Sequence, residues 1–225
     1  MSWFSEMTRT AIAKKAIMAL TGLMLFGFVL SHMAGNLKAF QGAEKFNAYA
    51  EGLRELGTPF LPHAGLLWIM RLGLLGAVGL HIWSATSLTL MNRRARPEAY
   101  RIRANVQADY AARTMRYSGY LLGFYILYHL MHLTFGNVHH DFIAGDAYHN
   151  LVKGFQVMPI AVMYIFANLL LGLHLYHGLW SLFQSLGLNH PRYNAWRRQF
   201  AMVFALIVTA GFVSVPIGVL AGWVA

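Results

Sequence analysis

Residues 16–37 read AIMALTGLMLFGFVLSHMAGNL, an apolar stretch without Asp, Glu, Lys or Arg. A transmembrane α-helix needs about 20 such residues to cross the hydrocarbon core of a bilayer. Lys14 and Lys15 precede this stretch as in a signal peptide. It is, however, longer than the hydrophobic region of about 7–15 residues in a signal peptide, and it contains His32. We therefore interpret it as a retained membrane helix.

Four further apolar stretches follow, at residues 64–91, 117–136, 157–186 and 200–223. The composition agrees with a membrane protein, because 12% of the 225 residues are charged, about half of the roughly 25% found in soluble domains. We predict an all-α, polytopic membrane protein with five transmembrane helices in a single domain over residues 1–225. This composition argues against soluble Rossmann or TIM-barrel enzymes and against nucleic-acid binding, despite the net charge of +10.

Basic residues gather before the first stretch, between the second and third, and between the fourth and fifth. The other two connections are balanced or acidic. By the positive-inside rule, the N-terminus is cytoplasmic, the C-terminus is outside, and the protein lies in the cytoplasmic membrane. The basic side chains of these three segments are Arg9, Lys14, Lys15, Arg93, Arg94, Arg96, Arg101, Arg103, Arg113, Arg116, Arg192, Arg197 and Arg198.

The chain has no cysteine and 11 histidines. Cysteine-ligated iron–sulfur clusters, thiolate zinc sites and covalent c-type haem are therefore excluded from this chain. If the protein carries electrons, it must use a non-covalent cofactor with other ligands, and histidine is the abundant candidate.

Histidines recur in an internal repeat. In the first and third stretches, a Thr-Gly or Ser-Gly dipeptide is followed, ten residues after its glycine, by His32 or His129. In the second and fourth stretches, His81 and His174 each end a Gly-Leu-His tripeptide. The first two stretches thus echo the third and fourth, and the fifth, which has no histidine, lies outside the repeat.

The helix rise of 1.5 Å per residue places these histidines at two depths. His32 and His129 fall roughly 20–25 Å from the inner boundary, whereas His81 and His174 fall roughly 18 Å from it. Two axial imidazoles make a low-spin, electron-transferring haem centre. We therefore predict a four-helix bundle around two haems, with His32 and His129 on the outer haem and His81 and His174 on the inner one, plus a fifth helix.

Other interpretations of the four histidines stay open. Each could hydrogen-bond a neighbouring helix or line a proton path. A histidine site for a transition-metal ion is disfavoured, because the pairs lie at different depths and the carboxylates lie in loops or tails.

Further residues are candidates for the surroundings of the haems. His132 and His177 follow His129 and His174 by three positions, so only one of each couple can face one iron. They could instead bond a haem propionate or a quinone. Arg71 could bind a propionate of the outer haem or extend to the membrane surface.

Weaker signals come from small and polar residues. Ser31, Asn36 and Glu51 are candidates for quinone or proton contacts, and the histidines in loops are expected to be solvated. Some glycines could leave space for a flat porphyrin or mediate helix contacts. These glycines are Gly22, Gly27, Gly76, Gly79, Gly119, Gly123 and Gly172.

Three segments together carry a family resemblance: KAIMALTG at 15–22 continuing to HMAGNL at 32–37 and FNAYA at 46–50, Ser118-Gly119 to His129, and HLYHGLWS at 174–181. The chain resembles the cytochrome b membrane-anchor subunit of succinate dehydrogenase and fumarate reductase, in its single-chain, five-helix, two-haem form. The resemblance covers nearly the whole chain. It implies the haem-iron ligands His32, His81, His129 and His174, paired as above.

The resemblance also implies two haem b groups, a quinone substrate, typically menaquinone, and two partners on the cytoplasmic face. These partners are a flavoprotein with FAD, which oxidises succinate in the tricarboxylic acid cycle, and an iron–sulfur subunit. The chain would pass electrons from the iron–sulfur subunit through the haems to quinone in the respiratory chain, in contact with membrane lipid. Two alternatives stay open: the haem b anchor of a hydrogenase or formate dehydrogenase, and a non-redox transporter.

Overall fold

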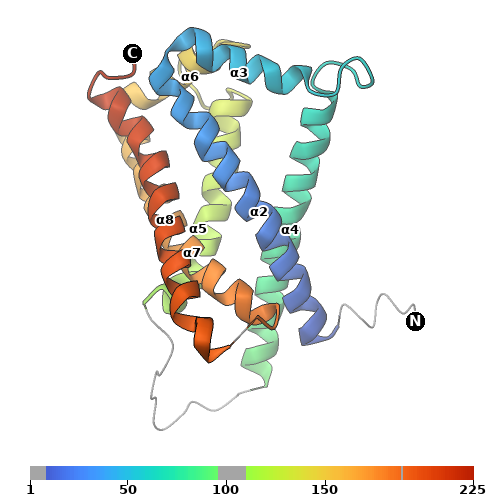
Figure 1. The fold of residues 1–225 in the computed structure, drawn as a ribbon. Helices are drawn as coiled ribbons and strands as arrows, with labels where there is room; N and C mark the ends of the chain where they lie inside the picture. Colours follow the sequence, from blue (N-terminus) through green and yellow to red (C-terminus); the bar gives the residue numbers. More distant parts are fainter. Residues whose placement is uncertain (1–8, 96–109, 189) are drawn as a thin grey trace.

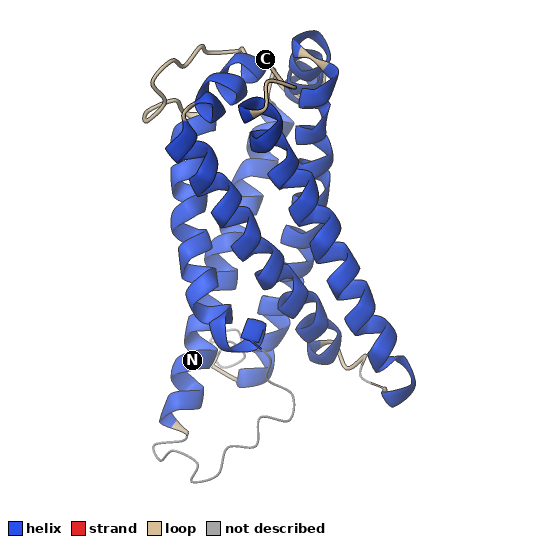
Figure 2. Cartoon of the chain, turned by 90° about the vertical axis from the view of Figure 1, so that its left-hand side faces the viewer, coloured by secondary structure: helices blue, strands red, loops and turns tan. Residues whose placement is uncertain are grey.

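The computed structural model describes residues 9–95, 110–188 and 190–225, which form helices and no strand (Figure 1, Figure 2). Four helical segments within this part are long and apolar enough to cross a membrane. The first is α2 (Ala11–Asn36) with its 3-10 extension η1 (Leu37–Gln41). The others are α4 (Gly65–Arg94), α7 (Met158–Ser185) and α8 (Pro191–Leu220). The chain is therefore built as a multi-pass membrane protein.

The third predicted stretch forms α5 (Tyr110–His129) and a π-helical turn, η2 (Leu130–Thr134). This segment is not among the four spans, although it runs beside them in Figure 1. Its α-helical part ends at His129 and includes Arg116, so its uninterrupted apolar length is short. The fifth crossing therefore stays a prediction.

The long helices enclose a common interior. Helix α2 packs along α4, α5 packs along α7, and contacts of α2 with α7 and of α4 with α5 complete the arrangement. Helix α8 packs extensively on α7 and also on α2. Met33 of α2, Leu175 of α7 and Val208 of α8 share one buried cluster. Helix α8 thus packs against two of the other long helices, α7 and α2.

Three helices begin earlier than predicted, at Ala11, Tyr110 and Pro191 instead of residues 16, 117 and 200. The fourth predicted stretch, 157–186, agrees with α7, and the residues before it form a separate helix, α6 (Ala147–Gln156), that joins α7 at Val157. Helix α8 begins at Pro191, well before the predicted start at residue 200, because proline suits the first helical position. In addition, the His190 side chain accepts a hydrogen bond from the Arg192 N–H. The first turns of α8 are polar, so a criterion based on hydrophobicity does not detect that the helix begins at Pro191.

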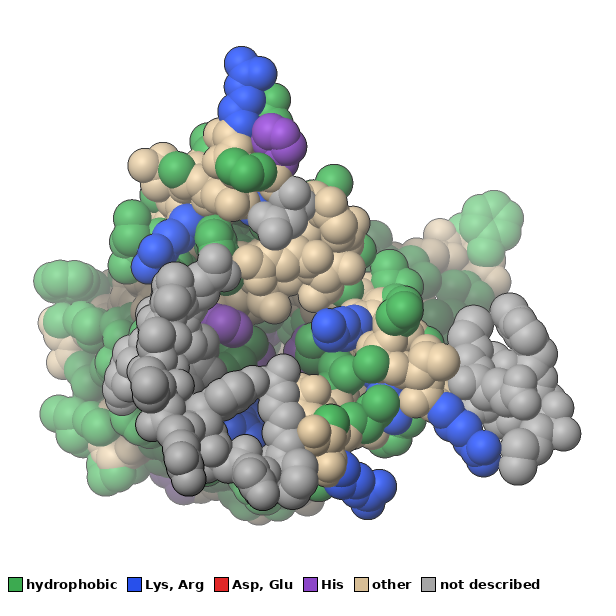
Figure 3. Space-filling view, turned by 90° about the horizontal axis from the view of Figure 1, so that it is seen from below, with side chains coloured by type: hydrophobic (Ala, Val, Ile, Leu, Met, Phe, Trp, Pro, Cys, Tyr) green, Lys and Arg blue, Asp and Glu red, His purple; other side chains and the backbone are tan. Residues whose placement is uncertain are grey.

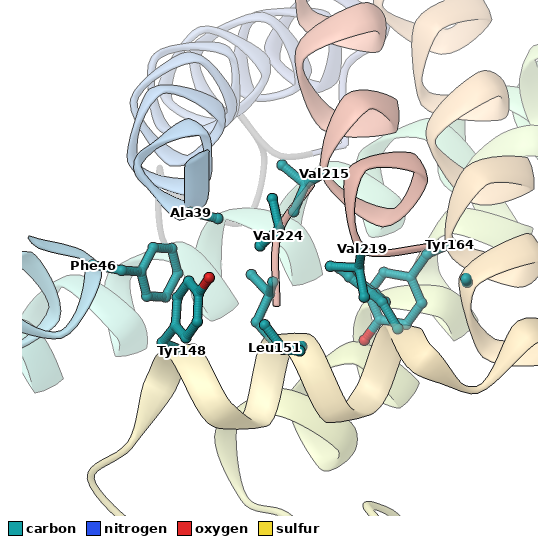
Figure 4. Packing of buried hydrophobic residues seen from close by; sticks show 11 residues of the cluster. Ala39, Phe46, Tyr148, Leu151, Tyr164, Val215, Val219 and Val224 are labelled. Carbon is teal, nitrogen blue, oxygen red and sulfur yellow. The ribbon is translucent and has the colours of Figure 1, made fainter. Parts of the chain in front are cut away.

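Helix α3 (Ala43–Glu55) and helix α6 cover one end of the bundle, where the sequence indicated only short connections. Phe46 of α3 packs on Tyr148 of α6 in a cluster that includes residues of α8 (Figure 4). The Asn47 amide donates to the Asp146 carboxylate at 2.9 Å and accepts from the Tyr148 N–H at 2.9 Å. We call this layer of α3 and α6 the outer cap.

Asp146 also begins α6, since its carboxylate accepts the His149 N–H at 2.9 Å. This bond and the Asn47 bond stabilise the ionised carboxylate and hold the pKa of Asp146 below its ordinary value. The cap is thus joined by a charge-assisted hydrogen-bond network as well as by apolar packing.

The two ends differ in charge. Within the described residues, every acidic side chain belongs to the end that carries the outer cap. Lys and Arg side chains surround the opposite end, which we call the basic end (Figure 3). Residues 96–109, which contain part of the predicted basic connection, lie outside the described residues. The described acidic residues are Glu44, Glu51, Glu55, Asp141 and Asp146.

Candidate functional site

The structure brings His32 and His129 together, and we call them the outer pair. His32 lies on α2, and His129 is the last residue of α5. Their ring centres are 5.9 Å apart, and the ring planes are inclined by 78°. The contact joins the first and third of the predicted spans.

His81 of α4 and His174 of α7 form the inner pair. Their ring centres are 6.4 Å apart, with an angle of 59° between the planes. The ring of His81 lies against Gly22, and His32 follows ten residues later on α2. The two pairs are therefore separated by about 15 Å along the helix.

Both separations fit two imidazoles on one metal ion. A ligating imidazole nitrogen lies about 2 Å from a transition metal, and the ring centre lies about 1 Å further away. Two rings on opposite sides of one ion therefore have centres about 6 Å apart, close to the 5.9 and 6.4 Å observed. Bis-imidazole ligation of haem iron would require two rings at such a separation.

Some of the candidate glycines have open space beside them. A Cβ at Gly27, Gly76 or Gly79 would meet no atom within 4 Å. The basic end is hollowed in the space-filling view, and histidine side chains are visible inside it (Figure 3). Gly172 has another function, because a Cβ there would clash with Thr209 of α8. The candidate glycines thus differ, since some have open space beside them and Gly172 lies in a close helix contact.

Each histidine of the inner pair contacts a hydroxyl from a neighbouring helix. The Thr21 hydroxyl of α2 lies 3.1 Å from Nδ1 of His81. The Ser118 hydroxyl of α5 lies 3.4 Å from Nδ1 of His174. The glycines that follow, Gly22 and Gly119, face the Cε1 atoms of the same rings. The two halves of the sequence repeat therefore have matching structures.

The outer pair has mainly aromatic neighbours. His32 stacks on Phe28 at 5.1 Å and contacts Phe212 of α8 at 5.7 Å. The Tyr164 hydroxyl of α7 lies 3.4 Å from Nδ1 of His129. The ring of Tyr125 lies 6.0 Å from that of His129. Aromatic rings of this kind exclude water from the space around the pair.

Tyr164 bridges His132 and His129. His132 is fully buried, and its Nδ1 lies 3.0 Å from the Tyr164 hydroxyl. Its ring stacks on His139 at 4.7 Å, and His139 is held by the Asn150 carbonyl at 2.8 Å. His132 therefore joins the end of α5 to the outer cap. His139 is also part-buried and bonded, which differs from the solvated position that its loop location predicted.

The remaining candidates differ in their positions. The Arg71 guanidinium is 5.0 Å from the Trp68 ring centre on the same helix, so a propionate contact stays a prediction. His177 lies three residues after His174 on α7, and its predicted role near the inner haem stays a prediction too. The Asn36 amide donates to the backbone carbonyl of His32 and also approaches its ring.

Two weaker candidates have local partners. Ser31 donates to the carbonyl oxygens of Gly27 and Phe28. Glu51 lies in an exposed group with His63 at 2.9 Å and Arg54 at 2.7 Å. Hydrogen bonds from His63 and Arg54 hold the pKa of Glu51 below its ordinary value. Both side chains therefore have hydrogen-bond partners close to them in the sequence, and their contacts with quinone stay predictions.

Comparison with known families decides what kind of protein this is. A family model described as the succinate dehydrogenase/fumarate reductase transmembrane subunit matches residues 89–214, more than half of the chain. The chain belongs to this family. Searches of curated proteins and of solved structures give no significant match to this transmembrane subunit.

Family membership makes this transmembrane subunit a component of a succinate dehydrogenase or fumarate reductase complex, which is an oxidoreductase. The matched segment contains Ser118, His129 and His174. Their counterparts His32 and His81 lie before it, and the structure places them opposite His129 and His174. The family match and the pairing of the histidines are therefore independent observations.

Several contacts in the transmembrane subunit could not be predicted from its sequence. Tyr164 bridges His129 and His132, but nothing in its surrounding sequence marks this contact. Thr21 and Ser118 were recognised as repeated, yet only as markers of spacing. Their positions beside histidines of other helices depend on how the helices pack, which one sequence does not reveal.

Proposed function

We propose that this chain is the dihaem cytochrome b anchor of a succinate:quinone oxidoreductase. The proposal is supported above all by the two histidine pairs, whose ring centres are separated as expected for two ligands of one iron. His81 and His174 would hold the inner haem b, and His32 and His129 the outer one. Family membership supplies the physiological context.

Haem bound at both pairs would supply one-electron transfer between the iron–sulfur subunit and quinone, with menaquinone as the expected substrate. The chain's own residues have three tasks. The imidazoles ligate iron, the inner-pair hydroxyls orient two of them, and the aromatic side chains at the outer pair exclude water. No residue of this chain forms a covalent intermediate in the proposal.

We infer that the basic end faces the cytoplasm and that α5 completes five crossings. The charge difference between the ends supports this orientation through the positive-inside rule. The basic end would bind the flavoprotein with FAD and the iron–sulfur subunit. Because this chain has no cysteine, the iron–sulfur clusters must belong to the iron–sulfur subunit. The same basic side chains would also attract anionic lipid.

The two alternatives from the sequence are weaker after the comparison. A hydrogenase or formate dehydrogenase anchor would not be expected to match this family. A non-redox transporter would have no reason to place two pairs of imidazoles at metal-binding separations.

Haem counting in the intact, detergent-purified complex tests the proposal. We expect two haems per chain in the wild type and one in His81→Ala or His32→Ala. The matched control is His177→Ala, which removes a histidine from the same helix as His174 and is expected to retain both haems. The measurement is a pyridine haemochromogen assay normalised to the chain.

Two results would contradict the assignment. A complex without haem would exclude a cytochrome. Retention of two haems in His81→Ala would show that the inner ligands are wrong, and loss of a haem in His177→Ala would shift the ligand along α7.

A further inference from the structure

The Thr-Gly and Ser-Gly dipeptides contact the inner pair, not the histidines that follow them in sequence. Thr21 of α2 contacts His81 of α4, and Ser118 of α5 contacts His174 of α7. Each contact involves Nδ1 of the imidazole. The repeat therefore builds two equivalent contacts between neighbouring helices.

The direction of these hydrogen bonds follows from the other partners of the hydroxyls. The Thr21 hydroxyl lies 2.7 Å from the Ile17 carbonyl oxygen, and the Ser118 hydroxyl lies 3.0 Å from that of Met115. A hydroxyl has one proton and two lone pairs. Because a carbonyl only accepts, the proton is used there, and the hydroxyl must accept from the imidazole.

This direction determines the tautomer of both rings. Nδ1 of His81 and of His174 must carry the proton in order to donate to the hydroxyl. In a neutral imidazole, the other nitrogen then has a free lone pair. Nε2 is consequently the nitrogen available to iron in both members of the inner pair.

The glycines fix where the rings lie. A Cβ at Gly22 would lie 3.3 Å from Cε1 of His81, and a Cβ at Gly119 would lie 3.3 Å from Cε1 of His174. Such distances are tighter than ordinary contacts, so glycine lets each ring approach the neighbouring helix. Each dipeptide thus provides a hydroxyl that accepts a hydrogen bond from the imidazole and a glycine against which the ring packs.

The outer pair has different polar neighbours. The Tyr164 hydroxyl is shared between His129 at 3.4 Å and His132 at 3.0 Å. The polar neighbour of His32 is the amide of Asn36, one turn along the same helix. A change at Thr21 or Ser118 should therefore affect one pair only.

We propose that Thr21 and Ser118 are positioning residues of the inner haem site. Each accepts a hydrogen bond from Nδ1, which favours Nε2 as the ligating nitrogen and increases the basicity of the imidazole. At His81, a hydrogen bond with the Met18 backbone adds to this effect. A more basic ligand favours ferric over ferrous iron, so these hydroxyls lower the midpoint potential of the inner haem. The inference rests on the proposed function, because it assumes haem at the inner pair.

Redox titration of the intact complex tests the inference with Thr21→Val and Thr21→Ser. Valine keeps the shape of threonine but cannot accept a hydrogen bond, whereas serine retains the hydroxyl. We expect Thr21→Val to raise the midpoint potential of one haem and leave the other unchanged. Haem transfer to apomyoglobin should become faster, in line with the about 10- to 100-fold effects of such supporting residues on metal affinity. Thr21→Ser should resemble the wild type.

The matched pair Ser118→Ala and Ser118→Thr should give the same result on the same haem. The inference is overturned if Thr21→Val leaves both potentials and the transfer rate unchanged, or if valine and serine have equal effects. Failure of the proposed function looks different, because the wild-type complex would then lack haem or His81→Ala would retain two haems. Either of those results overturns the inference as well.

Discussion

The inner and outer histidine pairs have similar separations but different surroundings. At the inner pair, both imidazoles contact a hydroxyl and a glycine from a neighbouring helix. At the outer pair, His32 is stacked among phenylalanines, and His129 shares a tyrosine hydroxyl with His132. The inner site is therefore nearly symmetric, whereas the outer site is not.

This difference shows what an internal repeat preserves. The repeat places a histidine at corresponding positions on α2 and α5, with an aromatic residue four positions before each, yet other neighbours come from unrelated parts of the chain. Tyr164 of α7 and Phe212 of α8 belong to no repeated motif. Two centres with equal ligands can thus differ in their electronic environment, because burial and hydrogen bonding tune a haem as well as its ligands do.

The largest expected effect concerns the close glycine contact of the inner pair. Gly119→Val places a branched side chain where a single Cβ already lies 3.3 Å from His174. We expect loss of the inner haem with the outer haem retained, measured as haem per chain. The milder Gly119→Ala should retain both haems, since a shift of a few tenths of an ångström relieves the contact. Equal haem contents in the two variants would contradict a steric role for this glycine.

A smaller effect is expected at the outer pair from Tyr164→Phe. Loss of this hydroxyl leaves Nδ1 of the fully buried His132 without its partner. An unsatisfied buried polar group costs about 1–3 kcal/mol. We therefore expect a lower thermal unfolding temperature and an altered outer-haem spectrum, with the inner haem unchanged. The control Tyr128→Phe keeps the ring that stacks on His132, and a Tyr164→Phe protein as stable as this control would refute the expectation.

A weaker effect, which depends on pH, is expected at the outer cap and not at the basic end. The pKa of Asp146 is held below its ordinary 3.8 by bonds from the His149 N–H and Asn47. Its ionised form therefore stabilises the cap fully above that ordinary value, and the contribution is lost as the pH falls through the lower folded-state pKa. Hydrogen exchange of α6 should increase under acid conditions in the wild type. In Asp146→Asn, exchange should be faster at neutral pH and less dependent on acid; identical profiles would contradict the network.

The smallest effect is expected from Glu51→Gln in the exposed group with Arg54 and His63. Hydrogen bonds from His63 and Arg54 lower the pKa of Glu51, so the carboxylate is ionised at neutral pH and the pairs are screened by solvent. We expect unchanged haem content and quinone reductase activity in membranes. A marked loss of quinone reduction would instead support the sequence-based candidacy of Glu51 at the quinone.

Much of the architecture could be predicted from local sequence. Length and hydropathy located the four spanning helices, because the bilayer imposes a minimum apolar length. Helix rise alone grouped His32 with His129 and His81 with His174, and the structure places these residues side by side. Both predictions depend only on the spacing of residues along a helix, and this spacing can be read from the sequence.

Contacts across helices could not be predicted in the same way. The outer cap was missed because α3 and α6 are too short and too polar for a hydropathy criterion. The contact of Tyr164 with His129 depends on the rotation of α7 relative to α5, which spacing does not define. The early start of α8 depends on Pro191 and a capping histidine rather than on apolar periodicity.

Helix α2 contributes to both centres, with Thr21 at one and His32 at the other. Because both residues lie on one helix, α2 cannot rotate about its axis or shift along it without changing the contacts of both pairs. The geometry of one histidine pair is thereby coupled to that of the other through a single helix. A tilt of α2 caused by lipid thickness or partner binding would change both pairs together.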